Sequence, residues 1–149
     1  MQNGLLMAKL RCNQGLSQKE VAQYLNVALT VYKLYEANIR AMKIEELNQF
    51  SNYFKISLNT LLGLSNSLRN VKPSQIDYKY LRFSMKYVRK IHRVTQKDLA
   101  KEFDVSIPTV ARFEKHPEDM NANYLRCFAL KFHVSVDYIC GKTLKKEVL

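Results

Sequence analysis

Apolar residues recur along the N-terminal part of the chain with the period of amphipathic helices. Leu6 and Leu10 lie one helical turn apart, and Gly15 stands where a helix C-terminus commonly takes a glycine. Ser17-x-x-Glu20 then has the form of a capping box, in which two side chains satisfy free backbone N–H groups at a helix start. The pattern predicts a helix that ends near Gly15, a second that begins after Ser17, and a sharp turn at Asn26, which tolerates a left-handed conformation.

Three further apolar stripes follow before residue 64. Val31 and Tyr35 face inward in the first of them, and Leu47, Phe50 and Phe54 face inward in the second. The third is short and lies between an N-capping serine and a terminal glycine. These stripes predict three more helices, at about residues 28–36, 43–54 and 57–62.

The same pattern of residues occurs twice. Residues 16–22 align with residues 94–100 at an offset of 78, and this offset runs without a gap from residues 5–64 to residues 83–142. A repeat that keeps one register over about sixty residues indicates two units of the same fold. The second unit is therefore predicted to hold helices at about residues 77–93, 96–103, 106–115, 121–132 and 135–140.

The chain is thus expected to be all-α, with one domain at residues 1–64 and another at residues 77–142. Residues 65–76 form the predicted linker, and residues 143–149 form a C-terminal tail. A fully extended linker of this length reaches roughly 45 Å. Two arrangements stay open: units that sit apart on separate sites, and units that pack against each other.

Residues 17–36, which read Ser-Gln-Lys-Glu-Val-Ala at their start and Tyr-Glu at their end, resemble the phage-repressor family of helix-turn-helix domains, the Cro and XRE type. Residues 95–114 resemble that family as closely. The shared signature is Gln after Ser or Thr, Ala four residues later, Val in the turn, and Tyr or Phe before a final Glu. This resemblance implies two tandem five-helix lambda-repressor-like helix-turn-helix domains.

The resemblance also implies where double-stranded DNA would lie. The third helix of each unit would enter the major groove by its N-terminal part, and polar side chains nearby would hold phosphates. The implied base-reading candidates are Ala28, Leu29, Thr30, Lys33, Ser106, Ile107, Thr109, Ala111 and Arg112. The implied phosphate-binding residues are Gln18, Asn38, Arg40, Lys43, Gln96 and Lys115. The family likeness further implies ion pairs between the first and third helices, Arg11 with Glu36 and Arg89 with Glu114.

Neither third helix carries the polar set that family members usually offer to bases. Leu29 and Ile107 can make only apolar contacts, for example to a thymine methyl group, and Leu34 stands where the family often has arginine. Exposed apolar residues on such a helix also suit a protein-interaction module, antitoxin-like or inhibitory. This alternative stays open beside a repressor-like, sequence-specific transcriptional regulator, as do homodimerisation and a protein partner.

The first unit is expected to carry more of the DNA contact than the second. Arg40 and Lys43 follow the third helix of the first unit, whereas Glu118 and Asp119 follow that of the second and would repel phosphate. The basic excess of the second unit is expected away from the groove, on the helix at residues 77–93 and in the C-terminal tail at Lys142, Lys145 and Lys146.

Charge and composition narrow the function class. A formal net charge of +11 favours a polyanionic partner, with nucleic acid ahead of an anionic membrane surface. No apolar stretch is long enough to span a membrane, and no secretory signal is recognisable, so the chain is expected to be cytoplasmic. The residues form no catalytic, metal-binding or nucleotide-binding motif, so no enzyme activity, metal or cofactor is expected. The cysteines are expected to be packing residues: Cys12, Cys127 and Cys140.

Overall fold

The protein is all-helical over residues 1–148, the range that this computed structural model describes. Leu149, the end of the predicted tail, lies outside the described residues. The N-terminal half contains α1 (Gly4–Asn13), α2 (Gln18–Tyr24), α3 (Leu29–Glu36), α4 (Ile44–Phe54) and α5 (Leu58–Leu61). The C-terminal half contains α6 (Tyr78–Ile91), α7 (Gln96–Glu102), α8 (Ile107–Lys115), a 3₁₀ turn (Pro117–Asp119), α9 (Ala122–Phe132) and α10 (Val136–Ile139). None of the helices in residues 1–148 is long and apolar enough to cross a bilayer.

The two halves have the same order of helices. From α2 onward, each helix of the N-terminal half starts 78 residues before its counterpart in the C-terminal half. The first helices differ, because α1 starts at Gly4, whose equivalent is Arg82, whereas α6 already starts at Tyr78. Helix α6 therefore extends one turn further at its N-terminus.

Local sequence explains where α2 and α7 begin. The Ser17 hydroxyl accepts a hydrogen bond from the Glu20 N–H at 3.1 Å, and the Glu20 carboxylate accepts one from the Ser17 N–H at 3.2 Å. Thr95 and Asp98 form the same capping box at the start of α7. Two of the N–H groups that every helix start leaves free are thereby satisfied by neighbouring side chains.

The tight turns after α2 and α7 also have matching geometry. Asn26 and Asp104 both adopt left-handed backbone conformations, with φ of 55° and 52°. Short polar side chains tolerate this region better than most. The loops after α3 and α8 differ: Asn38 is left-handed at φ 56°, whereas Pro117 begins the 3₁₀ turn, which the sequence pattern did not predict.

The apolar core runs through both halves. Tyr32, Tyr35 and Phe50 are among the largest fully buried side chains of the N-terminal half, and Phe128 lies at the same position as Phe50 in the C-terminal half. Two residues near the ends of α6 and α1 are exposed, and one of them is a cysteine that was expected to pack. Ile91, at the end of α6, is 55% exposed, and Cys12, near the end of α1, lies on the surface, so only Cys140 among the cysteines is fully buried.

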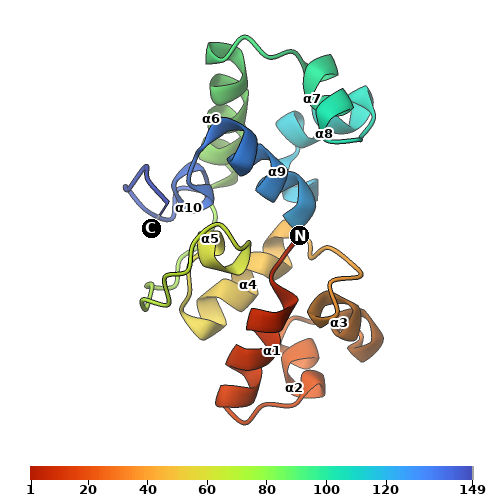
Figure 1. The fold of residues 1–149 in the computed structure, drawn as a ribbon, viewed down its shortest axis with the longest axis vertical. Helices are drawn as coiled ribbons and strands as arrows, with labels where there is room; N and C mark the ends of the chain where they lie inside the picture. Colours follow the sequence, from red (N-terminus) through yellow and green to blue (C-terminus); the bar gives the residue numbers. More distant parts are fainter. Residues whose placement is uncertain (149) are drawn as a thin grey trace.

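The halves pack against each other through their C-terminal helices. In Figure 1, α4 and α5 meet α9 and α10 at the middle of an elongated molecule, and α2–α3 and α7–α8 lie toward its two ends. The connecting segment runs along the N-terminal half, where the Val71 N–H bonds to the Lys55 carbonyl and the Ser74 N–H bonds to Asn52. Of the two arrangements left open by the sequence, the structure has the packed one.

Candidate nucleic-acid interface

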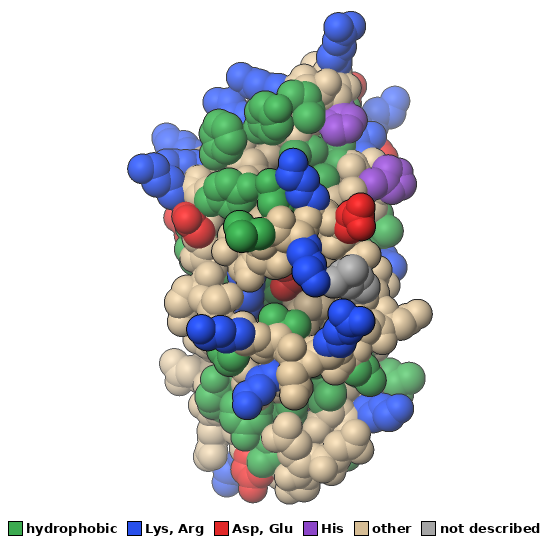
Figure 2. Space-filling model, turned by 90° about the vertical axis from the view of Figure 1, so that its left-hand side faces the viewer, with side chains coloured by type: hydrophobic (Ala, Val, Ile, Leu, Met, Phe, Trp, Pro, Cys, Tyr) green, Lys and Arg blue, Asp and Glu red, His purple; other side chains and the backbone are tan. Residues whose placement is uncertain are grey.

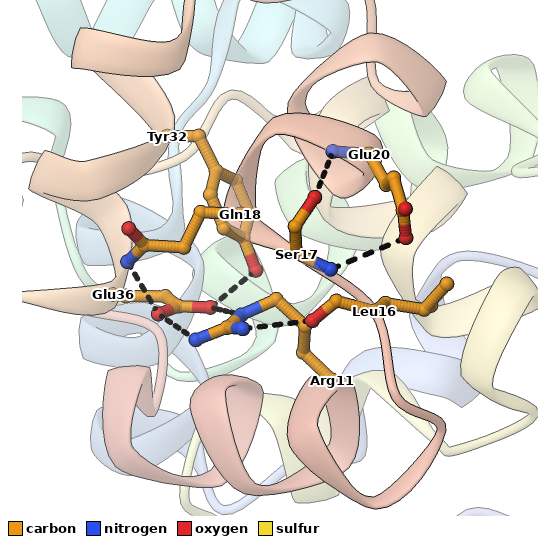
Figure 3. Close-up of polar contacts among 7 residues, drawn as sticks. All are labelled: Arg11, Leu16, Ser17, Gln18, Glu20, Tyr32 and Glu36. Atoms are coloured by element: carbon orange, nitrogen blue, oxygen red, sulfur yellow. Dashed lines mark hydrogen bonds and ion pairs between the residues drawn. The ribbon is translucent and has the colours of Figure 1, made fainter.

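A buried ion pair holds α1 against α3 in the N-terminal half (Figure 3). Arg11 Nε donates to Glu36 Oε1 at 2.6 Å, and Arg11 Nη2 donates to Glu36 Oε2 at 3.1 Å. A third guanidinium nitrogen, Nη1, donates to the Leu16 carbonyl just before α2. The two side chains are only 14% and 7% exposed. Arg11 thus connects α1 with the residue before α2 and with the last residue of α3.

Two further donors complete the hydrogen bonding of Glu36. Gln18 Nε2 donates to Oε2 at 2.9 Å, and the Tyr32 hydroxyl donates to Oε1 at 2.7 Å (Figure 3). Burial raises the pKa of the Glu36 carboxyl, but the hydrogen bonds from Arg11, Gln18 and Tyr32 outweigh it and leave the pKa below its ordinary value. Gln18, expected to bind phosphate, therefore has a structural role as well, and one N–H of its amide is already engaged.

The exposed surface of α3 carries two polar side chains, Thr30 and Lys33. Ala28, Thr30 and Lys33 are exposed, and no side chain of the described residues caps this helix at Ala28. Leu29 and Leu34 are only half-buried rather than freely exposed. The exposed apolar surface that the sequence predicted at these two leucines is therefore smaller than expected.

Asn38 is a structural residue. Its Oδ1 accepts a hydrogen bond from the Gly4 N–H at 3.0 Å, which ties the loop after α3 to the start of α1. The contact is close enough that a Cβ on Gly4 would lie 2.2 Å from the Glu36 carbonyl oxygen. Asn38 is nevertheless exposed, as are Arg40 and Lys43, which follow it.

Comparison with protein families decides the identity of this half. The helix-turn-helix family matches residues 7–61, from within α1 to the end of α5. The N-terminal half is a Cro/XRE-type helix-turn-helix domain. Comparisons with curated proteins and with solved structures gave no significant match. The helix-turn-helix family is a DNA-binding family. Its members place the second helix of the motif in the major groove, and α3 is the equivalent helix of this half.

The C-terminal half contains the same buried pair as the helix-turn-helix domain. The Arg89 guanidinium donates two hydrogen bonds to the Glu114 carboxylate and one to the Val94 carbonyl, and Gln96 Nε2 donates to Glu114 Oε2 at 2.9 Å. The equivalent of Tyr32 is Val110, so Glu114 lacks that hydroxyl donor. All four residues predicted to pair are thus brought together, in two matching sites.

The exposed surface of α8 differs from that of α3. Ile107 is 46% exposed and Thr109 is half-buried, with its hydroxyl 2.7 Å from the Ser106 hydroxyl at the helix start. Arg112 Nε lies 3.9 Å from the Asp119 carboxylate, and both side chains are about half exposed. An acid from the following 3₁₀ turn therefore offsets part of the positive charge on α8.

A basic row on α6 borders the surface of α8. Lys79, Arg82 and Lys86 are spaced so that they share one face of α6, and with Phe83 they line a groove whose other wall includes Gln96, Ala111 and Lys115. These α6 cations therefore lie beside α8, closer to its surface than the sequence predicted. The spacing Lys-x-x-Arg-x-x-x-Lys was visible in the sequence, but its direction depends on how α6 packs against α8.

Lys142 is also not a free tail residue. It is partly buried and donates hydrogen bonds to the side-chain oxygens of Asn48 and Asn52 on α4.

Positive charge is not confined to the side of the molecule that carries α3 and α8. Figure 2 shows the opposite side, which also carries lysine and arginine side chains over its whole length. Among residues 1–148, no three His, Cys, Asp or Glu side chains are grouped so that they would hold a metal ion.

Proposed function

We propose that this protein is a sequence-specific, repressor-like transcriptional regulator that inserts the N-terminal part of α3 into the major groove of DNA. The observation that carries the proposal is the helix-turn-helix match over residues 7–61, combined with the exposure of Thr30 and Lys33 on α3. Such a helix presents its first residues to base edges, while its flanks contact the sugar-phosphate backbone. Occupying a groove in this way excludes other proteins from the same site.

Three cations of the N-terminal half are suited to phosphate contacts. Lys33, Arg40 and Lys43 are exposed and form no ion pair with the described residues. The remaining N–H of Gln18 and the backbone N–H groups at the start of α2 add neutral donors. Lys33 lies on α3 itself, and the other two cations follow it in the chain. These cations would bind phosphates of the DNA strands that border the major groove.

The C-terminal half is proposed to act as a second helix-turn-helix unit. It has the same helix order, the same capping box and the same buried arginine–glutamate pair as the N-terminal domain. Its reading residues would be Ser106, Ile107, Thr109 and Arg112, with Gln96, Lys115 and the basic row of α6 (Lys79, Arg82 and Lys86) toward the phosphates. The acid that lies beside Arg112 is thereby offset by cations of a neighbouring helix.

Binding of a labelled duplex of random sequence, measured over a range of salt concentrations, tests the proposed function. Association should weaken steeply as salt increases, because phosphate contacts release counterions. Lys33→Ala and Arg40→Ala should each reduce the slope of log K against log salt by about one. Arg69→Ala removes an exposed charge from the connecting segment and should leave the slope unchanged.

The alternative, a protein-interaction module, gives a different result in the same titration. A module that binds only protein would show no duplex binding even at low salt. The structure offers less support for this alternative, because Leu29 and Leu34, which would form the apolar contact with a partner, are half-buried. Absence of binding at every salt concentration would overturn the proposed function and favour this alternative.

A further inference from the structure

The two halves contact each other through equivalent residues. The Ile44 N–H donates to the Met120 carbonyl at 3.0 Å, and the Ala122 N–H donates to the Met42 carbonyl at 2.8 Å. Met42 and Met120 are one repeat apart, as are Ile44 and Ala122. Between them, Lys43 forms an antiparallel bridge with Asn121, its own equivalent. Each half therefore makes equivalent hydrogen bonds to the other at this contact.

A second set of contacts repeats this reciprocity at α5 and α10. The Asp137 carboxylate accepts hydrogen bonds from the Leu58 and Asn59 N–H groups, at 2.9 and 2.8 Å. Asn59, which is the equivalent of Asp137, accepts one from the Val136 N–H at 2.8 Å through its own side-chain oxygen. Each of the two residues thus caps the first turn of the other half's last helix.

We infer that the two halves form an intramolecular pseudo-dimer about an approximate two-fold axis, and that one chain reads a DNA site of two inverted, unequal half-sites. In an isologous, two-fold interface, every contact occurs twice. If one residue of the first half contacts a second residue in the other half, the equivalents of these two residues also contact each other. An axis that exchanges the halves also exchanges α3 with α8. The inference rests on the proposed function, since it names the class of DNA that the same surfaces recognise.

The placement of the reading helices agrees with this axis. In Figure 1, α3 and α8 lie on the same side of the molecule and toward its opposite ends, with the α4–α5 and α9–α10 contact between them. Two helices on one side of a rigid body reach the same face of a duplex. Their half-sites should therefore be separated by about one helical turn, roughly 10–10.5 base pairs between centres, or by a multiple of it.

Buried hydrogen bonds between the halves fix the distance between α3 and α8. Asn59, Ser135 and Asp137 are buried, and Asn59 Nδ2 also donates to the Ser135 hydroxyl at 2.9 Å. Arg126 Nε donates to the Leu62 carbonyl at 3.0 Å, and Lys142 bonds to α4 on the other side of the contact. A hydrogen-bonded, buried junction fixes the separation of the reading helices, whereas a flexible linker would let it vary.

The half-sites are expected to differ in sequence. At the positions where α3 has Leu29, Thr30, Lys33 and Leu34, α8 has Ile107, Pro108, Ala111 and Arg112. An ordinary homodimer presents two copies of one helix and reads a palindrome. This chain presents two different helices, so an asymmetric site is read without a second copy of the protein.

A spacing series on a site selected from random duplexes tests the rigid arrangement. Light scattering should show one chain per bound duplex, and destroying either half-site should weaken binding by about 100-fold or more, as expected for loss of one of two linked contacts. Inserting either five or ten base pairs between the half-sites should weaken it similarly. Tolerance of the ten-base-pair insertion would indicate a flexible tether, and a two-chain complex would indicate conventional dimerisation; either result overturns the inference.

A chimera tests the inverted orientation. The variant Ile107→Leu, Pro108→Thr, Ala111→Lys and Arg112→Leu places the α3 residues of these four positions on α8 while keeping Ser106 as the helix cap. Its selected site should become an inverted repeat of the half-site that α3 reads. A direct repeat would contradict the two-fold arrangement, and a site that does not change would show that α8 does not read bases.

The same experiments separate the two claims. If the wild-type chain binds no duplex, the proposed function fails and the inference fails with it. If the chain binds DNA but protects one half-site only, the proposed function stands and the pseudo-dimer is overturned as a reader of two half-sites.

Discussion

Asn59 and Asp137 occupy equivalent positions in the two halves, and each accepts backbone hydrogen bonds from the first turn of the other half's last helix. The exchange is unequal, because Asp137 accepts two hydrogen bonds where Asn59 accepts one, and Asp137 carries a titratable carboxyl. Burial raises the pKa of that carboxyl above its ordinary value, although the backbone donors and Lys142 oppose the rise. The contact between the halves thus depends on a polar pair in the interior of the molecule.

Removal of the Asp137 side chain should weaken the contact between the halves. Asp137→Ala leaves the Leu58 and Asn59 N–H groups buried without an acceptor, which should cost about 1–3 kcal/mol for each. Chemical denaturation should show a lower free energy of unfolding. Asp119→Ala, a change to an exposed acid, should stay within about 0.5 kcal/mol of the wild type. Equal stability of the two variants would show that the Asp137 cap contributes nothing.

The Arg11–Glu36 pair should contribute more to stability than an exposed pair. Glu36→Ala leaves a largely buried guanidinium without its partner and should lower the free energy of unfolding by about 3–5 kcal/mol. Glu102→Ala breaks the pair with Lys131, whose two side chains are 49% and 24% exposed, and should cost about 0–1 kcal/mol. Thermal and denaturant melts of both variants measure the contrast, and similar losses in the two would contradict the role assigned to burial.

Acid should remove the stabilisation that Glu36 provides. Its folded-state pKa is below the ordinary value of 4.5, so the ionised carboxylate contributes fully above that pH, and the contribution is lost as the pH falls through the folded pKa. The difference in unfolding free energy between wild type and Glu36→Gln should therefore be constant from neutral pH to about pH 5 and narrow in more acidic solution. A difference that widens with acid would reverse the assigned sign.

The basic row of α6 should contribute to DNA binding by the C-terminal half. Arg82→Ala and Lys86→Ala should each weaken binding across sequences and lower the salt slope by about one for each lost phosphate contact. Arg69→Ala serves again as the charge-matched control. If the row variants behave as this control does, α6 lies away from the DNA, and the N-terminal half carries most of the contact.

Much of the fold follows from local signals in the sequence. Every helix from α3 onward whose two ends were predicted begins and ends within two residues of the predicted position. Polar N-caps that act on the next few N–H groups mark most of these starts, although α3 begins at Ala28 without one. Gly15, Gly63 and Gly141 adopt positive φ at the ends of helical segments, as their positions indicated. These features depend on neighbours in the chain and can be read without the tertiary structure.

The features that sequence reasoning missed depend on packing between segments far apart in the chain. Asn38 was assigned to phosphate because it follows α3, but it bonds to the Gly4 N–H, 34 positions away. Lys142 was assigned to a free tail, but it lies against α4. The direction of the α6 row and the reciprocal caps at Asn59 and Asp137 likewise follow from how helices meet, which residue spacing within one helix does not specify.

The most direct test of DNA recognition is the ratio of two affinities at one physiological salt concentration. The duplex selected from random sequence is compared with a duplex of equal length and scrambled sequence. A sequence-specific regulator should bind the selected duplex at least about 1,000-fold more tightly, and Thr30→Ala, which changes a base-facing position, should reduce that ratio. Equal affinity for the two duplexes, or binding to neither, would contradict the account.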